Sequence, residues 1–128
     1  MSYYFQKTIQ ADLDTAIKQV TEALKLEGFG VLTEIDVQTT LKKKLDVDFR
    51  PYRILGACNP NFAYKALQSE ENIGTMLPCN VIVQVKKEGE VQISAIDPIA
   101  SMQAVQNEAL GSIAGEVQAK LRKVIDSL

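Results

Sequence analysis

Residues 80–96, with the sequence NVIVQVKKEGEVQISAI, decide the fold of this 128-residue chain. Apolar side chains recur at every second position on both sides of Glu88-Gly89, at Val81, Val83 and Val85 and at Val91, Ile93 and Ala95. Because glycine accepts the positive φ angle of a tight turn, the pattern predicts strands over residues 80–87 and 90–96 that form a hairpin with one apolar face. A tight hairpin permits only antiparallel pairing, so at least one strand pair is antiparallel.

The residues before the hairpin alternate between strand and helix patterns. Strands are expected over residues 3–9, 29–36 and 52–57, and the second of these should carry Val31, Thr33 and Ile35 on one face. Between the first two strands, an apolar stripe at three- and four-residue spacing predicts a helix that begins at Asp12 or Asp14. Gly28 can end this helix by adopting positive φ.

Further helices are predicted after the second strand. A four-residue apolar repeat over residues 37–45 predicts a short helix that turns Lys42-Lys43-Lys44 towards solvent. Asn59-Pro60 signals another helix start, where the Asn59 side chain should accept from free backbone amides. The side of this helix expected to be buried carries Ala63, Ala66 and Leu67. The long helix predicted after Asp97-Pro98 has its stripe at Leu110, Ile113, Val117, Leu121, Val124 and Leu128.

The predicted element order is therefore β-α-β-α-β-α-β-β-α. This order favours one α+β domain over residues 1–128, built of two layers. One layer is a mixed sheet of about five strands, and the other consists of three to four helices packed mainly on one face of it. A chain of this length can bury a core without disulfides or a metal.

The composition excludes several classes of function. Histidine is absent, which removes imidazole catalysis and most zinc sites. The net charge of -2 gives no basic footprint for nucleic acid and no cationic face for an anionic membrane. No apolar run approaches the roughly 20 residues that span a bilayer. Since no signal-peptide pattern is visible, we expect a cytoplasmic protein with reduced cysteines.

The two cysteines lie in nearly mirror-image segments, Cys58-Asn59-Pro60 and Pro78-Cys79-Asn80. Cys58 immediately precedes a predicted helix start, where free amides favour a thiolate. Cys79 has the parity of the buried valines of its strand, and burial without a charged partner would raise its pKa and leave it inert. Both cysteines can also be read as small buried hydrophobic residues, which free cysteines frequently are.

The distance between the two thiols depends on strand direction, which the sequence leaves open. If strands 52–57 and 80–87 are parallel, the crossover separates Cys58 from Cys79 by roughly a strand length, about 17–20 Å. If they are antiparallel, the end of one strand meets the start of the next. The Cα atoms could then approach to the disulfide range, below about 7 Å.

Carboxylates provide the remaining candidates for chemistry. Two thiols are too few for a structural zinc site, so Glu34, Asp36 or Asp97, or a second subunit, would have to complete a metal shell. The spacing matches no known metal motif. Glu34 and Asp36 also form an acid/base pair on one strand face, although such a pair more often caps the following helix and faces solvent.

The chain resembles the bacterial and archaeal family catalogued as "domain of unknown function 302". The matching segments cover most of the chain and are residues 28–31, 34–37, 40–45, 52–60, 77–83 and 97–98. The resemblance implies a small α/β single-domain protein that is commonly a dimer. It implies no activity, because no catalytic or ligand-binding residues of the family are available to carry over.

Three functions remain in competition. The first is a module that binds a small molecule or a soft metal ion near Cys58, Asn59, Cys79 and Asn80, with the asparagine amides as the polar end of an apolar pocket. The second is a structural or regulatory homodimer without chemistry, since the hydrophobic content is high for a small domain. The third is a thiol-based redox protein, which lacks the Cys-x-x-Cys spacing and any histidine base. An enzymatic role is the less favoured reading.

Overall fold

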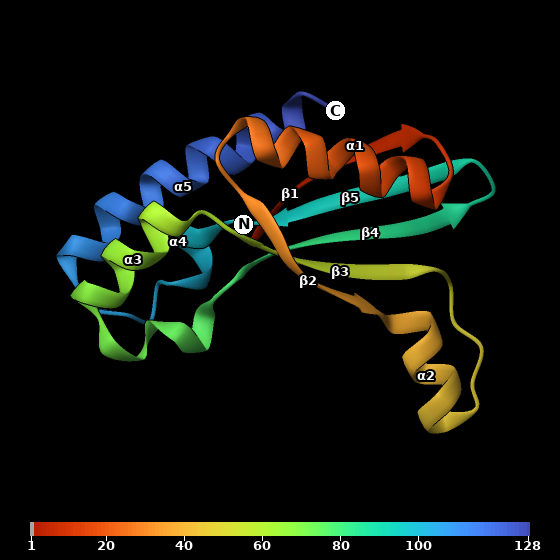
Figure 1. Ribbon diagram of the computed structural model, residues 1–128, viewed down its shortest axis with the longest axis horizontal. Coiled ribbons are helices and arrows are strands. Elements are labelled where there is room, and N and C mark those ends of the chain that lie inside the picture. Colours follow the sequence, from red (N-terminus) through yellow and green to blue (C-terminus); the bar gives the residue numbers. More distant parts are fainter. Residues whose placement is uncertain (1) are drawn as a thin grey trace.

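The computed structural model describes residues 2–128 and confirms an α+β domain (Figure 1). The elements follow in the order β1 (Tyr4–Gln10), α1 (Leu13–Leu26), β2 (Gly30–Asp36), α2 (Val37–Leu45), β3 (Tyr52–Cys58), α3 (Pro60–Ser69), the 3-10 helix η1 (Glu71–Met76), β4 (Cys79–Lys87), β5 (Glu90–Ile96), α4 (Pro98–Ser101) and α5 (Glu108–Asp126). No helix within residues 2–128 is both long enough and apolar enough to cross a membrane.

The five strands form one sheet in the order β1-β5-β4-β3-β2, and every neighbouring pair is antiparallel. The mixed sheet expected from the sequence is therefore wrong in this detail. β1 and β2 do run in the same direction, as the intervening helix α1 suggests, but three strands separate them. Helix α1 thus connects the two edges of the sheet and creates no parallel pair.

The predicted hairpin is confirmed and lies in the middle of the sheet. Val81 pairs with Ala95, and Val83 with Ile93, and all four side chains are fully buried. Gly89 adopts φ +77° at the turn. Helices α1 and α5 cover this face, and the residues they bury against it include Ala16, Val20, Leu24, Leu121 and Val124.

The predicted faces of β2 are wrong because the strand contains a bulge. Val31 pairs with Ala57, but Thr33 pairs with Gly56, so Leu32 is an extra residue. Val31 packs on the core, whereas Thr33 faces the opposite side of the sheet together with Gly56. A bulge places two residues opposite one, which breaks the alternation that the prediction assumed. As a result Leu32 is left 68% exposed.

The helix ends show which capping predictions hold. Asp12 begins α1 by accepting from Thr15 N at 2.8 Å, and Gly28 follows the helix with φ +85°, both as predicted. The predicted cap at Asn59 is wrong: its Nδ2 donates to the carbonyl of Glu27 at 3.3 Å, and its side chain does not cap α3. Gly28 permits this contact, because a Cβ there would lie 2.9 Å from Asn59 Nδ2.

We expect Gly56→Ala to lower the free energy of unfolding by about 1–3 kcal/mol, as overpacking typically does. A Cβ at this position would overlap Thr33 Oγ1 and lie 2.7 Å from the ring of Pro78. Urea denaturation measures the change. The matched control is Gly111→Ala in α5, where a Cβ meets open space, so its effect should be neutral or stabilising by up to about 1 kcal/mol. Equal losses in the two variants would contradict the packing account.

Candidate functional site

A cavity of about 290 Å³ lies between the sheet and the helices α3 and α5. It separates two apolar clusters. The main core contributes Ala57 and Val117, and a smaller cluster around Ile73 contributes Ala66 and Leu110. Ala63 and Ala114 also line the space, so alanines occupy positions where larger side chains would fill it. The cavity is thus the gap between two separately packed groups of side chains.

The antiparallel pairing of β3 and β4 determines where the two cysteines lie. Ala57 pairs with Cys79, so Cys58 at the end of β3 and Cys79 at the start of β4 lie at the same end of the sheet. Both residues line the cavity. Both are free and only partly buried, which agrees with the expectation that no permanent disulfide joins them.

Cys79 has the character predicted for it. Burial, together with the nearby Cys58 thiol, raises the pKa of Cys79 to about 11. The side chain is therefore a neutral thiol at physiological pH. A neutral thiol is a poor nucleophile and a poor metal ligand, because both reactions use the thiolate.

The two asparagines of the Cys-Asn segments lie in different places. Asn59 lines the cavity next to Cys58. Asn80 pairs with Gly56 and points away from the cavity, where it is exposed on the opposite face of the sheet. Neighbouring residues of a strand point to opposite faces, so Cys79 and Asn80 cannot both reach the cavity.

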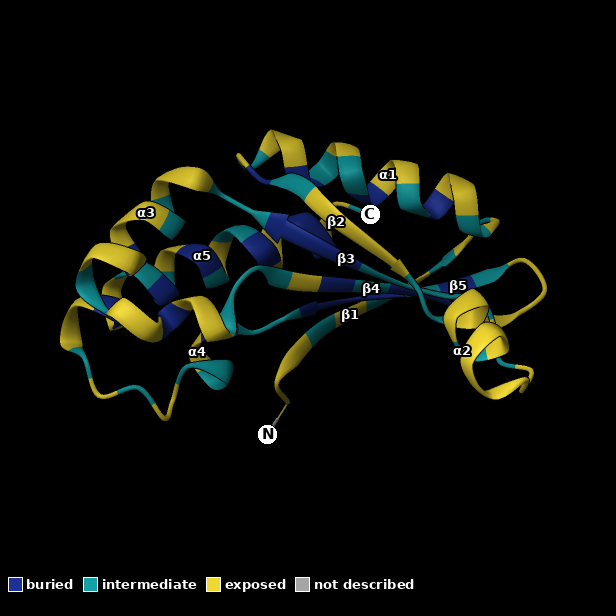
Figure 2. Cartoon of the chain, turned by 60° about the horizontal axis from the view of Figure 1, so that its bottom comes forward, coloured by how far each residue is buried: buried dark blue, intermediate teal, exposed yellow. Residues whose placement is uncertain are grey.

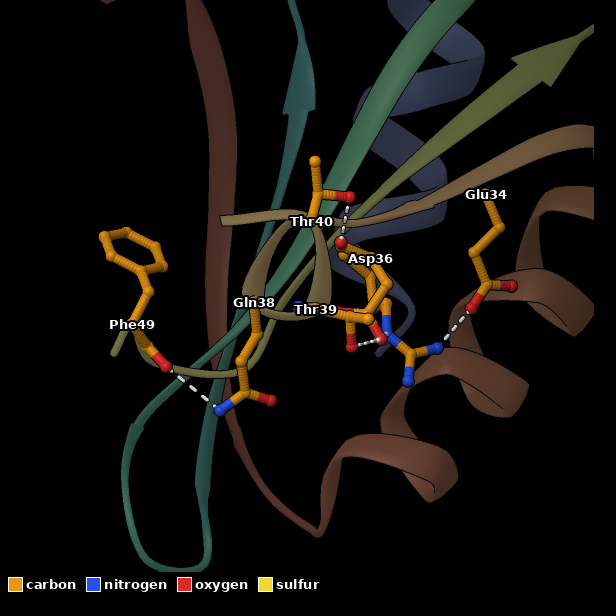
Figure 3. Close-up of polar contacts among 7 residues, drawn as sticks. Glu34, Asp36, Gln38, Thr39, Thr40 and Phe49 are labelled. Atoms are coloured by element: carbon orange, nitrogen blue, oxygen red, sulfur yellow. Dashed lines mark hydrogen bonds and ion pairs between the residues drawn. The ribbon is translucent and has the colours of Figure 1, made fainter. Parts of the chain in front are cut away.

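The carboxylates lie outside the cavity and have structural partners. Asp36 caps α2 by accepting from Thr39 N at 3.0 Å and Thr39 Oγ1 at 2.9 Å, and these bonds hold the pKa of Asp36 below its usual value (Figure 3). Arg53 forms ion pairs with both Glu34 and Asp36. Asp97 caps α4 through Ile99 N at 3.0 Å and also accepts from Gln118 Nε2 at 3.0 Å.

These placements leave no shell for a metal ion. Among residues 2–128, no group of three or more Cys, Asp or Glu side chains is arranged to hold one. Glu34, Asp36 and Asp97 do not join Cys58 and Cys79. Asp36 caps helix α2, as the alternative interpretation of the Glu34 and Asp36 pair predicted.

The sequence placed several of these wall residues on buried helix faces, but it did not predict that they line a cavity. Phe62 and Leu67 come from α3, Met102 follows α4, and Ile113 comes from α5. Ala63, Ala66 and Leu67 were predicted to be buried, but only Ala66 is, and Leu67 is 46% exposed at the cavity. Apolar side chains carry no chemical signature, and the two alanines of α3, Ala63 and Ala66, are equally consistent with ordinary helix packing.

We expect Cys79 in the folded wild-type chain, followed in its own proteolytic peptide apart from Cys58, to react with iodoacetamide about 100-fold more slowly at pH 8 than in the urea-unfolded chain. A pKa of about 11, against the ordinary 9.0, reduces the thiolate fraction by about that factor. Mass spectrometry of timed samples gives the rates. Because the Cys79 thiol of the folded chain ionises at a higher pH than the thiol of the unfolded chain, its alkylation rate should continue to rise up to about pH 11. Similar rates in the two states at pH 8 would contradict the assignment.

The family model described as "Domain of unknown function DUF302" matches residues 5–128. A solved structure described as an uncharacterized conserved protein DUF302 from Bacillus stearothermophilus matches with a TM-score of 0.89 and 29% sequence identity, over 98% of each chain. No curated protein matches the chain.

Proposed function

The chain belongs to the DUF302 family, a domain of unknown function, and we propose that it binds a small, mainly apolar organic molecule in the cavity beside Cys58 and Cys79. The observation that carries the proposal is the cavity itself. Its volume of about 290 Å³ is close to the lower end of ligand pockets, roughly 300–1,000 Å³. Its walls are almost entirely hydrocarbon, with few polar groups.

Packing energetics support a ligand over an empty space. Protein interiors contain few voids larger than a water molecule. An apolar ligand in this space would supply the packing contacts that its hydrocarbon wall lacks on that side. Leu32 and Leu67 line the cavity and are 68% and 46% exposed, so they form an apolar rim through which a ligand can enter.

The polar groups of the cavity define the chemistry of the ligand. Asn59 Nδ2 donates one of its two hydrogens to the carbonyl of Glu27, and the amide oxygen of Asn59 can accept from a hydroxyl or an N–H group of a ligand. Within the described residues 2–128, no lysine or arginine lines the cavity. A neutral molecule with one hydrogen-bond donor and an aliphatic or aromatic body therefore fits the wall better than an anion does.

The other candidate functions at this site have less support. A soft metal ion would find two thiols without a third ligand, and one of them has its pKa raised to about 11. The same raised pKa opposes a redox role in which Cys79 would act as a thiolate. Both observations favour organic ligand binding by shape and burial.

Normal alcohols from hexanol to decanol provide a direct test. We expect saturable binding by isothermal titration calorimetry, with an affinity that rises about fourfold per methylene until the cavity is full. This factor corresponds to about 0.8 kcal/mol for each buried CH₂ group. Absence of saturable binding throughout the series would contradict the proposed function.

The substitution Ala114→Leu places three carbon atoms in the cavity wall and should abolish the binding. The control is Ala119→Leu, the same change on the same helix at an exposed position. It should leave the alcohol affinity within about twofold. Thermal melts of both variants verify that they are folded, and equal affinities in the two variants would place the ligand elsewhere.

A further inference from the structure

The turn that ends α1 lies beside the residue that begins α3 (Figures 1 and 2). Asn59 Nδ2 donates to the carbonyl of Glu27 at 3.3 Å, and this contact joins two segments that are 32 residues apart in the chain. Asn59 also lines the cavity. The end of α1 therefore contacts a side chain that can touch a bound ligand, although Glu27 itself lies outside the cavity wall.

The turn after α1 is held in place by the core and by α5. Phe29 N donates to the carbonyl of Leu24 at 2.9 Å, and both residues are buried in the main core. The Glu27 carboxylate forms ion pairs with Lys120 at 3.9 Å and with Lys123 at 3.5 Å, both on α5. The carbonyl that accepts from Asn59 thus belongs to a turn with a defined position.

Gly28 allows the Asn59 amide to approach this turn. Gly28 has φ +85°, and a Cβ at this position would lie 2.9 Å from Asn59 Nδ2. Nδ2 is the end of a side chain, so the amide would turn away from an added Cβ while the backbone stayed. A side chain at residue 28 would therefore displace the Asn59 amide from the carbonyl of Glu27.

The contact with Glu27 determines which end of the amide faces a ligand. The oxygen of Asn59 cannot take the place of Nδ2, because two acceptor oxygens would then face each other. Glu27 and Gly28 line a groove on the outside of the molecule, whereas Asn59 lines both this groove and the cavity. Nδ2 accordingly lies on the groove side. Oδ1, at the other end of the amide, is presented to the cavity.

We infer that Gly28 is a positioning residue of the cavity: it lets the turn after α1 hold Asn59 with Oδ1 towards the ligand, which makes the cavity selective for hydrogen-bond donors. The role rests on the proposed function and adds a specificity that a hydrocarbon wall cannot supply. An alcohol and an isomeric ether bury similar apolar surface, but only the alcohol can donate to Oδ1. One neutral hydrogen bond corresponds to about fivefold in affinity.

The isomers 1-octanol and heptyl methyl ether test this selectivity by isothermal titration calorimetry. We expect Gly28→Ala to weaken the binding of octanol about fivefold, the loss of one hydrogen bond, and to leave the binding of the ether within about twofold. Asn59→Leu, which keeps a similar shape without an acceptor, should have the same effect on both ligands. The readout is the ratio of the two affinities, which a general loss of stability would not change.

The matched control is Gly89→Ala. Gly89 has φ +77° at the hairpin turn, and a Cβ there meets nothing within 4 Å. The control thus introduces the same backbone strain as Gly28→Ala, at the end of β4 opposite to Cys79 and without a contact to Asn59. The ratio of octanol to ether affinity should equal that of the wild-type chain. Thermal melts compare the stability of the two glycine variants.

Asn59→Asp tests the positioning with Gly28 unchanged, so the result does not depend on whether Gly28→Ala folds. The carboxylate keeps acceptor oxygens but cannot donate to Glu27, and it should turn to the first backbone amides of α3, as an aspartate at this position normally does. Selectivity for octanol should therefore fall as in Gly28→Ala. Unchanged selectivity in either folded variant overturns the inference and leaves the cavity as a binding site. Absence of binding of both ligands to the wild-type chain contradicts the proposed function and the inference together.

Discussion

Because β3 and β4 pair antiparallel, with Ala57 opposite Cys79, the chain between them leaves the sheet and returns to it at the same end. The helices α3 and η1 therefore cannot cross over the sheet, and they pack beyond its end against the start of α5. Asn107 secures this packing: its Nδ2 donates to the carbonyl of Ser69 at 2.7 Å. A second apolar cluster forms there around Ile73, separate from the main core. The cavity is the space between these two clusters, so the pairing of two strands determines where the candidate site lies.

The sequence predicted those elements whose pattern is set by local physics. The hairpin at Gly89, the helix capped by Asp12 and the long stripe of α5 each follow from periodicity and turn chemistry, and each was found. The short elements α4 and η1 were missed, since four to six residues are too few for an apolar period to register. The bulge at Leu32 was also missed, because bulges arise from how two strands meet.

The direction of β3 relative to β4 could not be obtained from periodicity, and the position of the cysteines depended on it. The cavity could not be predicted from composition either, because alanine at residues 63 and 114 is equally consistent with tight helix packing. What the sequence did supply was the parity of Cys79, which places it on the core face. Its raised pKa is the physical consequence of that parity, since burial disfavours the charged form.

The two faces of the sheet differ in how their polar atoms are satisfied, and this difference indicates what each face can accept. On the helix side, Cys58, Cys79, Met102 and Asn59 are the polar or sulfur-bearing groups that line the cavity, within walls of carbon. A neutral thiol suits that wall because it is small, polarisable and only weakly hydrogen-bonding. On the face of the sheet opposite α1 and α5, Gln6 donates to Ser94 and Gln84 donates to Gln92 across neighbouring strands. Isoleucine and tyrosine side chains accompany them on this face. Such a surface can be buried by another protein, while the helix side offers a partly open apolar cavity of molecular size. One sheet thus provides two chemically distinct surfaces, and neither requires the other to be occupied.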